Sequence, residues 1–141
     1  MQPMGTMTFD ECYEVYKEMC VAAQNAGADA IVFETMMDLA EARCAVLAAK
    51  ENTHLPVLVT MTYEDSGRSF LGCDVAAMGM VLEGVGADAV GINCSLGPDR
   101  MLPVENESGK SYYGIIYVDG REMYRVNFTK NIQALYDFIN S

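Results

Sequence analysis

Asp88-Ala-Val-Gly-Ile-Asn-Cys-Ser-Leu-Gly-Pro98 is the stretch from which the fold can be argued. Its apolar run, Ala89 to Ile92, is short and lies between a Gly-Ala-Asp turn and a Gly-Pro turn, which predicts a buried strand of a parallel sheet. In α/β barrels and open α/β sheets, the loops that follow the strands build the ligand site. Asn93 and Cys94 begin such a loop, so Cys94 occupies a position where a functional side chain is expected.

Two similar helix-and-strand units precede this stretch. Gly27-Ala-Asp-Ala30 repeats the turn Gly86-Ala-Asp-Ala89, and each turn joins a predicted helix to a predicted strand. Repeated units of this kind imply parallel strands with right-handed crossovers, in an open sheet or a (βα)₈ barrel. Three strands complete neither, since a full barrel takes about 250 residues. The predicted helices are Thr8 to about Asn25, Leu39–Lys50 and Asp74–Val85, and the predicted strands are Ala30–Phe33, Val57–Met61 and Ala89–Ile92.

The first helix has a clear start and a clear apolar face. Thr8 is expected to be the N-cap, with Asp10 and Glu11 in the first turn, where acidic side chains suit the helix dipole. Apolar residues at helical spacing predict one buried stripe along this helix. These residues are Cys12, Val15, Tyr16, Met19, Cys20 and Ala23.

The chain changes character after Val104. Ser111–Val118 and Glu122–Phe128 alternate like strands around Asp119-Gly120, which predicts a β-hairpin, and Thr129 is expected to cap a short amphipathic helix. We therefore expect residues 1–104 to form the slice of a larger α/β fold and residues 105–141 to form a separate tail of hairpin and helix.

Composition limits the classes of function. The 141 residues are 51% hydrophobic, and 20 acidic residues against 9 basic ones give a net charge of −11, which argues against binding to nucleic acid or to an anionic membrane. No apolar run approaches the ~20 residues of a spanning helix, and the N-terminus lacks the features of a signal peptide. The five cysteines include no Cys-x-x-Cys pair and predict no disulfide framework, so we expect a cytoplasmic protein.

Cys94 and Glu34 are the candidate functional residues. Cys94 has three candidate roles: a buried structural thiol, a nucleophile, or a zinc ligand. The single histidine, His54, lies before a strand and therefore at the opposite end of the sheet, which argues against a Cys–His pair. Glu34 directly follows Ile-Val-Phe and should lie on the same rim of the sheet as Cys94, the rim being the edge where the strands end. A carboxylate there serves either as a cap or salt bridge for the loop or as a ligand contact, and we favour the ligand contact; Asp38 is the expected cap of the next helix.

Four motifs, in order along the chain, resemble the zinc-dependent homocysteine S-methyltransferase family, in particular the homocysteine-binding module of its cobalamin-dependent members. The resemblance runs from about Gln2 to Val104 and implies an incomplete (βα)₈ TIM barrel, a slice that holds strands four, five and six. The motifs are Gln2-Pro-Met-Gly5, Phe33-Glu-Thr-Met-Met-Asp38, Thr60-Met-Thr-Tyr63 with Gly67-Arg-Ser69, and Gly91-Ile-Asn-Cys-Ser-Leu-Gly-Pro98.

The resemblance also implies a mechanism. Cys94 would be one of three thiolate ligands of a catalytic zinc ion, which binds the sulfur of homocysteine and lowers its pKa, so that a thiolate exists at neutral pH. This thiolate would attack the methyl group of methylcobalamin, carried by a separate module. Glu34 would bind the ammonium group of homocysteine and orient it towards the metal.

Parts of the family pattern are missing from this sequence. The adjacent Cys-Cys pair that supplies the other two zinc ligands is absent, as are the first three strands, the strand-seven loop, and the cobalamin and folate modules. We therefore expect a fragment of a homocysteine methyltransferase that is not competent alone and needs a complementary barrel fragment. The alternative is a non-catalytic half-barrel that self-associates, or whose open strand edges are covered by the hairpin.

Overall fold

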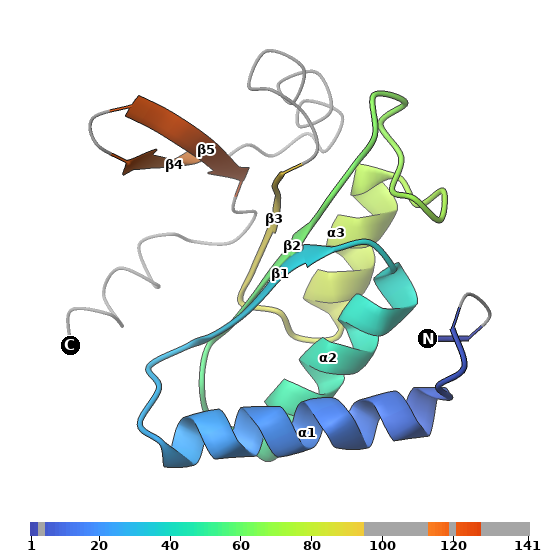
Figure 1. Cartoon of the computed structure of the whole chain (residues 1–141), viewed down its shortest axis with the longest axis vertical. Helices are drawn as coiled ribbons and strands as arrows, with labels where there is room; N and C mark the ends of the chain where they lie inside the picture. Colours follow the sequence, from blue (N-terminus) through green and yellow to red (C-terminus); the bar gives the residue numbers. More distant parts are fainter. Residues whose placement is uncertain (3–4, 95–112, 119–120, 128–141) are drawn as a thin grey trace.

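The computed structural model describes residues 1–2, 5–94, 113–118 and 121–127 (Figure 1). Its main body alternates helices with strands that pair as one parallel sheet in the order β1-β2-β3. This confirms the expected α/β slice with three parallel strands, and the described sheet does not close into a barrel. The elements of this body are α1 (Phe9–Asn25), β1 (Ile31–Met36), α2 (Leu39–Asn52), β2 (Val57–Met61), α3 (Val75–Gly84) and β3 (Ala89–Ile92).

The strands β2 and β3 have the predicted bounds, whereas β1 does not. It continues to Met36, so the predicted end of this strand at Phe33 was wrong. The reason is pairing with β2, because Met36 lies opposite Met61 after a register shift and accepts a hydrogen bond from the backbone N–H of Thr62 at 2.9 Å. The irregularity between Phe33 and Met36 has the character of a β-bulge, which re-aims the side chains at a strand end.

One face of the sheet holds the core. In Figure 1, α2 and α3 lie on one side of the strands, and alternate strand residues pack against buried helix residues such as Val46 and Leu82. On the opposite face, Val32 is 55% exposed. Parallel sheets normally have both faces covered. The cover of this face is uneven here, because Thr60 of β2 and Ala89 of β3 are buried whereas Val32 of β1 is not. The strand residues on the packed face are Ile31, Phe33, Val57, Val59, Met61, Val90 and Ile92.

The helix α1 begins as predicted but buries only part of its apolar stripe. Thr8 and Glu11 form a reciprocal capping box at its start. Cys12 and Cys20 are buried, whereas Val15 and Met19 are 47% and 58% exposed, so the prediction of one buried stripe was wrong. Among the described elements, α1 packs chiefly against α2, and its other flank has little cover.

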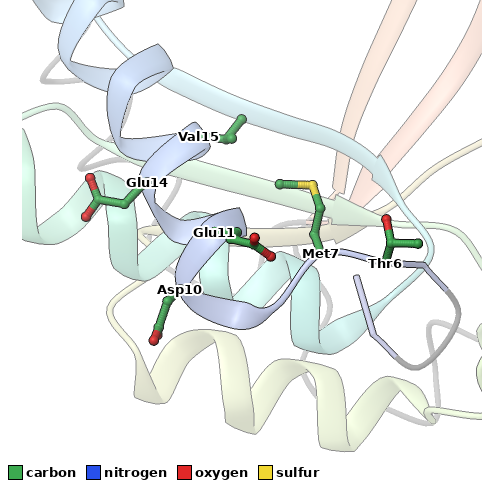
Figure 2. Close-up of a pocket in the computed structure, with 6 residues that line it drawn as sticks. All are labelled: Thr6, Met7, Asp10, Glu11, Glu14 and Val15. Atoms are coloured by element: carbon green, nitrogen blue, oxygen red, sulfur yellow. The ribbon is translucent and has the colours of Figure 1, made fainter.

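This uncovered flank of α1 contains a shallow hollow. It has a volume of about 800 Å³. Figure 2 shows Met7 and Val15 on one side of the helix and the carboxylates of Asp10 and Glu14 pointing away from them. The described residues that line it include no cysteine or histidine, and they are Thr6, Met7, Asp10, Glu11, Glu14 and Val15.

The described part of the tail is a hairpin. β4 (Tyr113–Val118) and β5 (Arg121–Asn127) pair antiparallel as a separate two-stranded sheet, as predicted. The backbone of β5 approaches β3, but the described residues include no ladder between them. The expected boundary at residues 104/105 and the expected helix after Thr129 lie outside the described residues. None of the helices in the described ranges is long and apolar enough to span a membrane.

Candidate active site at the carboxyl end of the sheet

A single buried side chain joins the ends of β1 and β3. Asn93 follows β3 directly, is only 3% exposed, and its backbone N–H donates to the carbonyl oxygen of Met61 at 3.1 Å. Its side-chain Nδ2 donates to Glu34 Oε1 at 3.1 Å and to Thr35 Oγ1 at 2.8 Å. The same nitrogen lies 3.4 Å from Cys94 Sγ. The structure therefore brings together the two residues predicted from the sequence, Glu34 and Cys94, which are linked through Asn93.

Glu34 is exposed, and its described partner is a neutral amide. The described ion pairs are Lys17–Glu14 and Lys50–Asp88, and neither involves Glu34. The interpretation of Glu34 as half of a salt bridge therefore finds no support among the described residues. Asp38 is the N-cap of α2, as predicted, because its carboxylate accepts from the backbone N–H of Ala40 at 2.8 Å.

Cys94 differs from the other cysteines in its exposure. All five are free thiols; Cys12, Cys20 and Cys44 are buried, Cys73 is intermediate, and Cys94 is exposed. The interpretation of Cys94 as a buried structural thiol is thus wrong. Burial, together with the neighbouring Cys12, raises the pKa of the Cys44 thiol to about 12, as expected for an inert core cysteine.

His54 is not a partner of Cys94. It precedes β2, whereas Cys94 follows β3, and the two strands run parallel. The two side chains therefore belong to opposite ends of the sheet, as predicted. This arrangement excludes a Cys94–His54 pair of the kind that activates a nucleophilic thiol.

The backbone at this rim is strained at two positions. Thr35 has φ 61° and Cys94 has φ 66°, and among the described residues they are the non-glycine residues with positive φ. Positive φ is unusual for a β-branched residue such as threonine. Such conformations cost energy and concentrate at functional sites. Both strained residues contact the side chain of Asn93.

A small hollow adjoins this network on the β1 side. It has a volume of about 260 Å³ and shares Thr35 with the network. Several exposed apolar side chains border it, with Met37 57%, Phe70 61% and Leu71 41% exposed. Its lining residues are Met1, Thr35, Met36, Met37, Asp38, Glu41, Phe70 and Leu71.

Comparison with known proteins agrees with the motifs at these strand ends. The profile of the homocysteine S-methyltransferase family matches residues 1–136. The chain belongs to this family. The match continues past residue 104, where we expected the resemblance to end, so the division into residues 1–104 and 105–141 stays a prediction.

Curated relatives of this homocysteine S-methyltransferase family member include two methionine synthases. The protein from Mycobacterium leprae (strain TN) is 34% identical over 103 residues, which cover 70% of this chain and 8% of that protein. The protein from Mycobacterium tuberculosis (strain ATCC 25618 / H37Rv) is 34% identical over 103 residues, which cover 70% of this chain and 9% of that protein. The chain thus spans less than a tenth of the length of these relatives.

The described residues of this family member do not complete a zinc site. A catalytic zinc ion usually has three protein ligands, and no group of three or more histidine, cysteine, aspartate or glutamate side chains gathers in the described ranges. The rim offers one exposed thiol, Cys94, and one carboxylate, Glu34. Within the described chain, the expected zinc site is therefore partial.

Sequence reasoning missed the residues that organise the rim. Asn93 lies inside the Gly-Ile-Asn-Cys motif but was given no role, and Thr35 was read as a loop residue. Thr60 also contributes, because its Oγ1 accepts from the backbone N–H of Thr35 at 3.1 Å. A usable signal was the position of Asn93, since an amide directly after a buried strand must find partners at the strand end.

Proposed function

We propose that this chain is one part of a homocysteine methyltransferase site, in which Glu34 binds the ammonium group of homocysteine and Cys94 supplies one thiolate ligand of a zinc ion. The observation that carries the proposal is the Asn93 amide, which contacts both Glu34 Oε1 and Cys94 Sγ. A carboxylate that can bind an amino acid and a thiol suited to zinc therefore lie on one rim of the sheet. The chain that forms this sheet belongs to the homocysteine S-methyltransferase family.

The charge around Glu34 supports a cationic ligand. Its carboxylate is exposed and belongs to no described ion pair, and the whole chain carries a net charge of −11. An ammonium group at this position gains a charge-assisted hydrogen bond and relieves like-charge repulsion.

Catalytic competence requires more groups than the described residues supply. A zinc ion held by Cys94 needs further ligands, and most of the affinity of such sites comes from a preformed set. We propose that a complementary barrel fragment supplies them and that methylcobalamin on a separate module is the methyl donor. The five free cysteines support a cytoplasmic location, where thiols stay reduced.

The test is a titration of the full ¹⁵N-labelled chain with L-homocysteine, with and without zinc, followed by NMR. We expect shifts at the rim formed by Glu34, Asn93 and Cys94, and a loss of homocysteine affinity of about tenfold or more in Glu34→Gln, because a hydrogen bond to a charged group is removed. Cys94→Ser should abolish the zinc-dependent part of the shifts.

Two matched variants control this titration. Glu18→Gln neutralises another exposed carboxylate, and Cys73→Ser removes another thiol outside the rim network. Both should bind as the unmodified chain does. Absence of any homocysteine-dependent shift at the rim, with or without zinc, would refute the proposal.

A second candidate function is that of a non-catalytic half-barrel that self-associates. It is favoured by the exposure of Val32, at 55%, on the β1 side of the sheet face opposite α2 and α3, and by the two open edges of β1 and β3 within the described sheet. Sedimentation of the full chain should then show a concentration-dependent dimer that Val32→Glu dissociates. A monomer at all accessible concentrations would exclude this candidate.

A further inference from the structure

We propose that Asn93 is a positioning residue that sets the separation between the carboxylate of Glu34 and the sulfur of Cys94. The reason that this separation matters rests on the proposed function, because one homocysteine molecule has to reach both groups. The geometric part of the proposal stands on the network itself.

In the described sheet, a side chain makes the direct link between the ends of β1 and β3. β1 and β3 are not neighbours, since β2 lies between them in the sheet. Ladder hydrogen bonds tie the end of each strand to β2, through Met36 and Asn93, but none in the described sheet joins β1 directly to β3. The amide of Asn93 spans the end of β2 and contacts Glu34 and Thr35 on one side and Cys94 on the other.

The chemistry of the contacts fixes the orientation of the amide. Nδ2 carries two hydrogens and lies within hydrogen-bonding distance of three acceptors, one of which is a carboxylate oxygen that cannot donate. Turning the amide over would place Oδ1 against this carboxylate oxygen, so the nitrogen has to face the rim. Oδ1 is buried and has no hydrogen-bond partner among the described residues.

An unpaired buried oxygen is costly, and its persistence needs an explanation. The side chain of Asn93 also contacts two residues with positive φ, Thr35 and Cys94. Through its three contacts, Nδ2 holds Glu34 together with two residues in energetically costly backbone conformations. The arrangement is consistent with a side chain retained for the placement of Glu34 and Cys94.

The first test uses the side-chain NH₂ signals of Asn93 in the ¹⁵N spectrum of the full chain, assigned by their loss in Asn93→Ala. We expect these signals to move in Glu34→Gln, Thr35→Ala and Cys94→Ser. The matched control is Asn52, whose Nδ2 donates to the hydroxyl of Tyr13 at 2.9 Å. Tyr13→Phe should move the Asn52 signals and leave those of Asn93 in place. Asn93 signals unchanged in all three rim variants would overturn the proposal.

The second test separates positioning from a general structural role. Homocysteine affinity should fall about tenfold in Asn93→Ala, yet fall by less than about twofold when Glu34→Gln is already present, because Asn93 acts through Glu34. Asn52→Ala should leave the affinity unchanged. Equal losses in the two backgrounds would show a structural effect and would overturn the proposal.

The two tests also distinguish failure of this proposal from failure of the proposed function. If the chain binds no homocysteine, the proposed function fails, and the NMR signals of Asn93 alone decide whether it joins Glu34 to Cys94. If homocysteine binds and the Asn93 signals have unchanged positions in the three rim variants, the proposed function stands and the positioning role is refuted.

Discussion

The two rims of the parallel sheet differ in whether residues other than glycine have positive φ. At the rim where the strands begin, the turns from helix to strand use glycine, with φ 87° at Gly27 and 99° at Gly86. At the rim where the strands end, Gly67 and Gly72 after β2 also have positive φ, and so do two non-glycine residues, Thr35 at 61° and Cys94 at 66°. Glycine adopts such angles without steric cost, whereas residues with a Cβ do not. Among the described residues, non-glycine positive φ thus occurs at the rim that holds the candidate site.

Asp88 at the first rim and Glu34 at the second differ in the partners of their carboxylates. Asp88, before β3, accepts from Lys50 Nζ at 2.9 Å and from the backbone N–H of Val57 at 2.8 Å. Glu34, at the end of β1, accepts from the neutral amide of Asn93. The carboxylate of Asp88 therefore has a cationic partner within the described chain, whereas that of Glu34 has a neutral one. Groups that break local rules in this way are expected at functional sites.

The largest predicted contrast concerns these acids. Asp88→Ala should lower the free energy of unfolding by about 2 kcal/mol, mainly because the N–H of Val57 loses its acceptor, while the half-exposed ion pair with Lys50 adds little. Asp88→Asn keeps an acceptor oxygen and should cost about 1 kcal/mol or less. Glu34→Gln should change the free energy of unfolding by less than about 0.5 kcal/mol. Urea unfolding measures all three, and an equal loss in Glu34→Gln and Asp88→Ala would contradict the contrast.

A smaller effect is expected from adding a Cβ at a positive-φ glycine of one rim, or from placing glycine at a positive-φ position of the other. Gly86→Ala should destabilise the fold by about 1 kcal/mol through its positive φ, because the added Cβ would lie 3.7 Å from Lys50 Cγ and would not clash. At the other rim, Cys94→Gly should be more stable than Cys94→Ala by up to about 1 kcal/mol. Both variants lack the thiol, so their difference in urea unfolding isolates the strain. Equal stability would show that Cys94 is not strained.

The smallest predicted effect concerns Glu11, a carboxylate that belongs to neither rim and serves as a reference. The hydrogen bond from the Thr8 backbone N–H lowers the pKa of Glu11 below its ordinary value of 4.5, as does its side-chain hydrogen bond with Thr8. Because the folded-state pKa is the lower one, this stabilisation is present above about pH 4.5 and is lost as the pH falls through the folded-state pKa.

Urea midpoints of the unmodified chain and Glu11→Gln, measured between about pH 3 and pH 6, should therefore differ at the upper end of this range and converge at the lower end. Glu14→Gln, in the same helix, controls for the loss of an acidic residue from α1. A difference between the unmodified chain and Glu11→Gln that does not depend on pH would contradict the capping role of Glu11.

The sequence by itself determined the elements whose signals are local. Ala89–Ile92 and Val57–Met61 were predicted with their observed bounds because each is a short apolar run between turns, and Thr8 was identified as a cap because capping involves only the first turn of a helix. The motifs after the strands also pointed to Glu34 and Cys94, since the position of a residue relative to its own strand is a local property.

Tertiary structure alone decided what depends on residues distant in the chain. β1 reaches Met36 because β2 offers hydrogen bonds there, and Val15 and Met19 are exposed because the described chain places no helix over that flank of α1. Asn93 gained its role in the same way, because its partners on β1 are 58 and 59 residues away. Composition and periodicity record which side chains prefer burial, but only the packed sheet determines which of them meet.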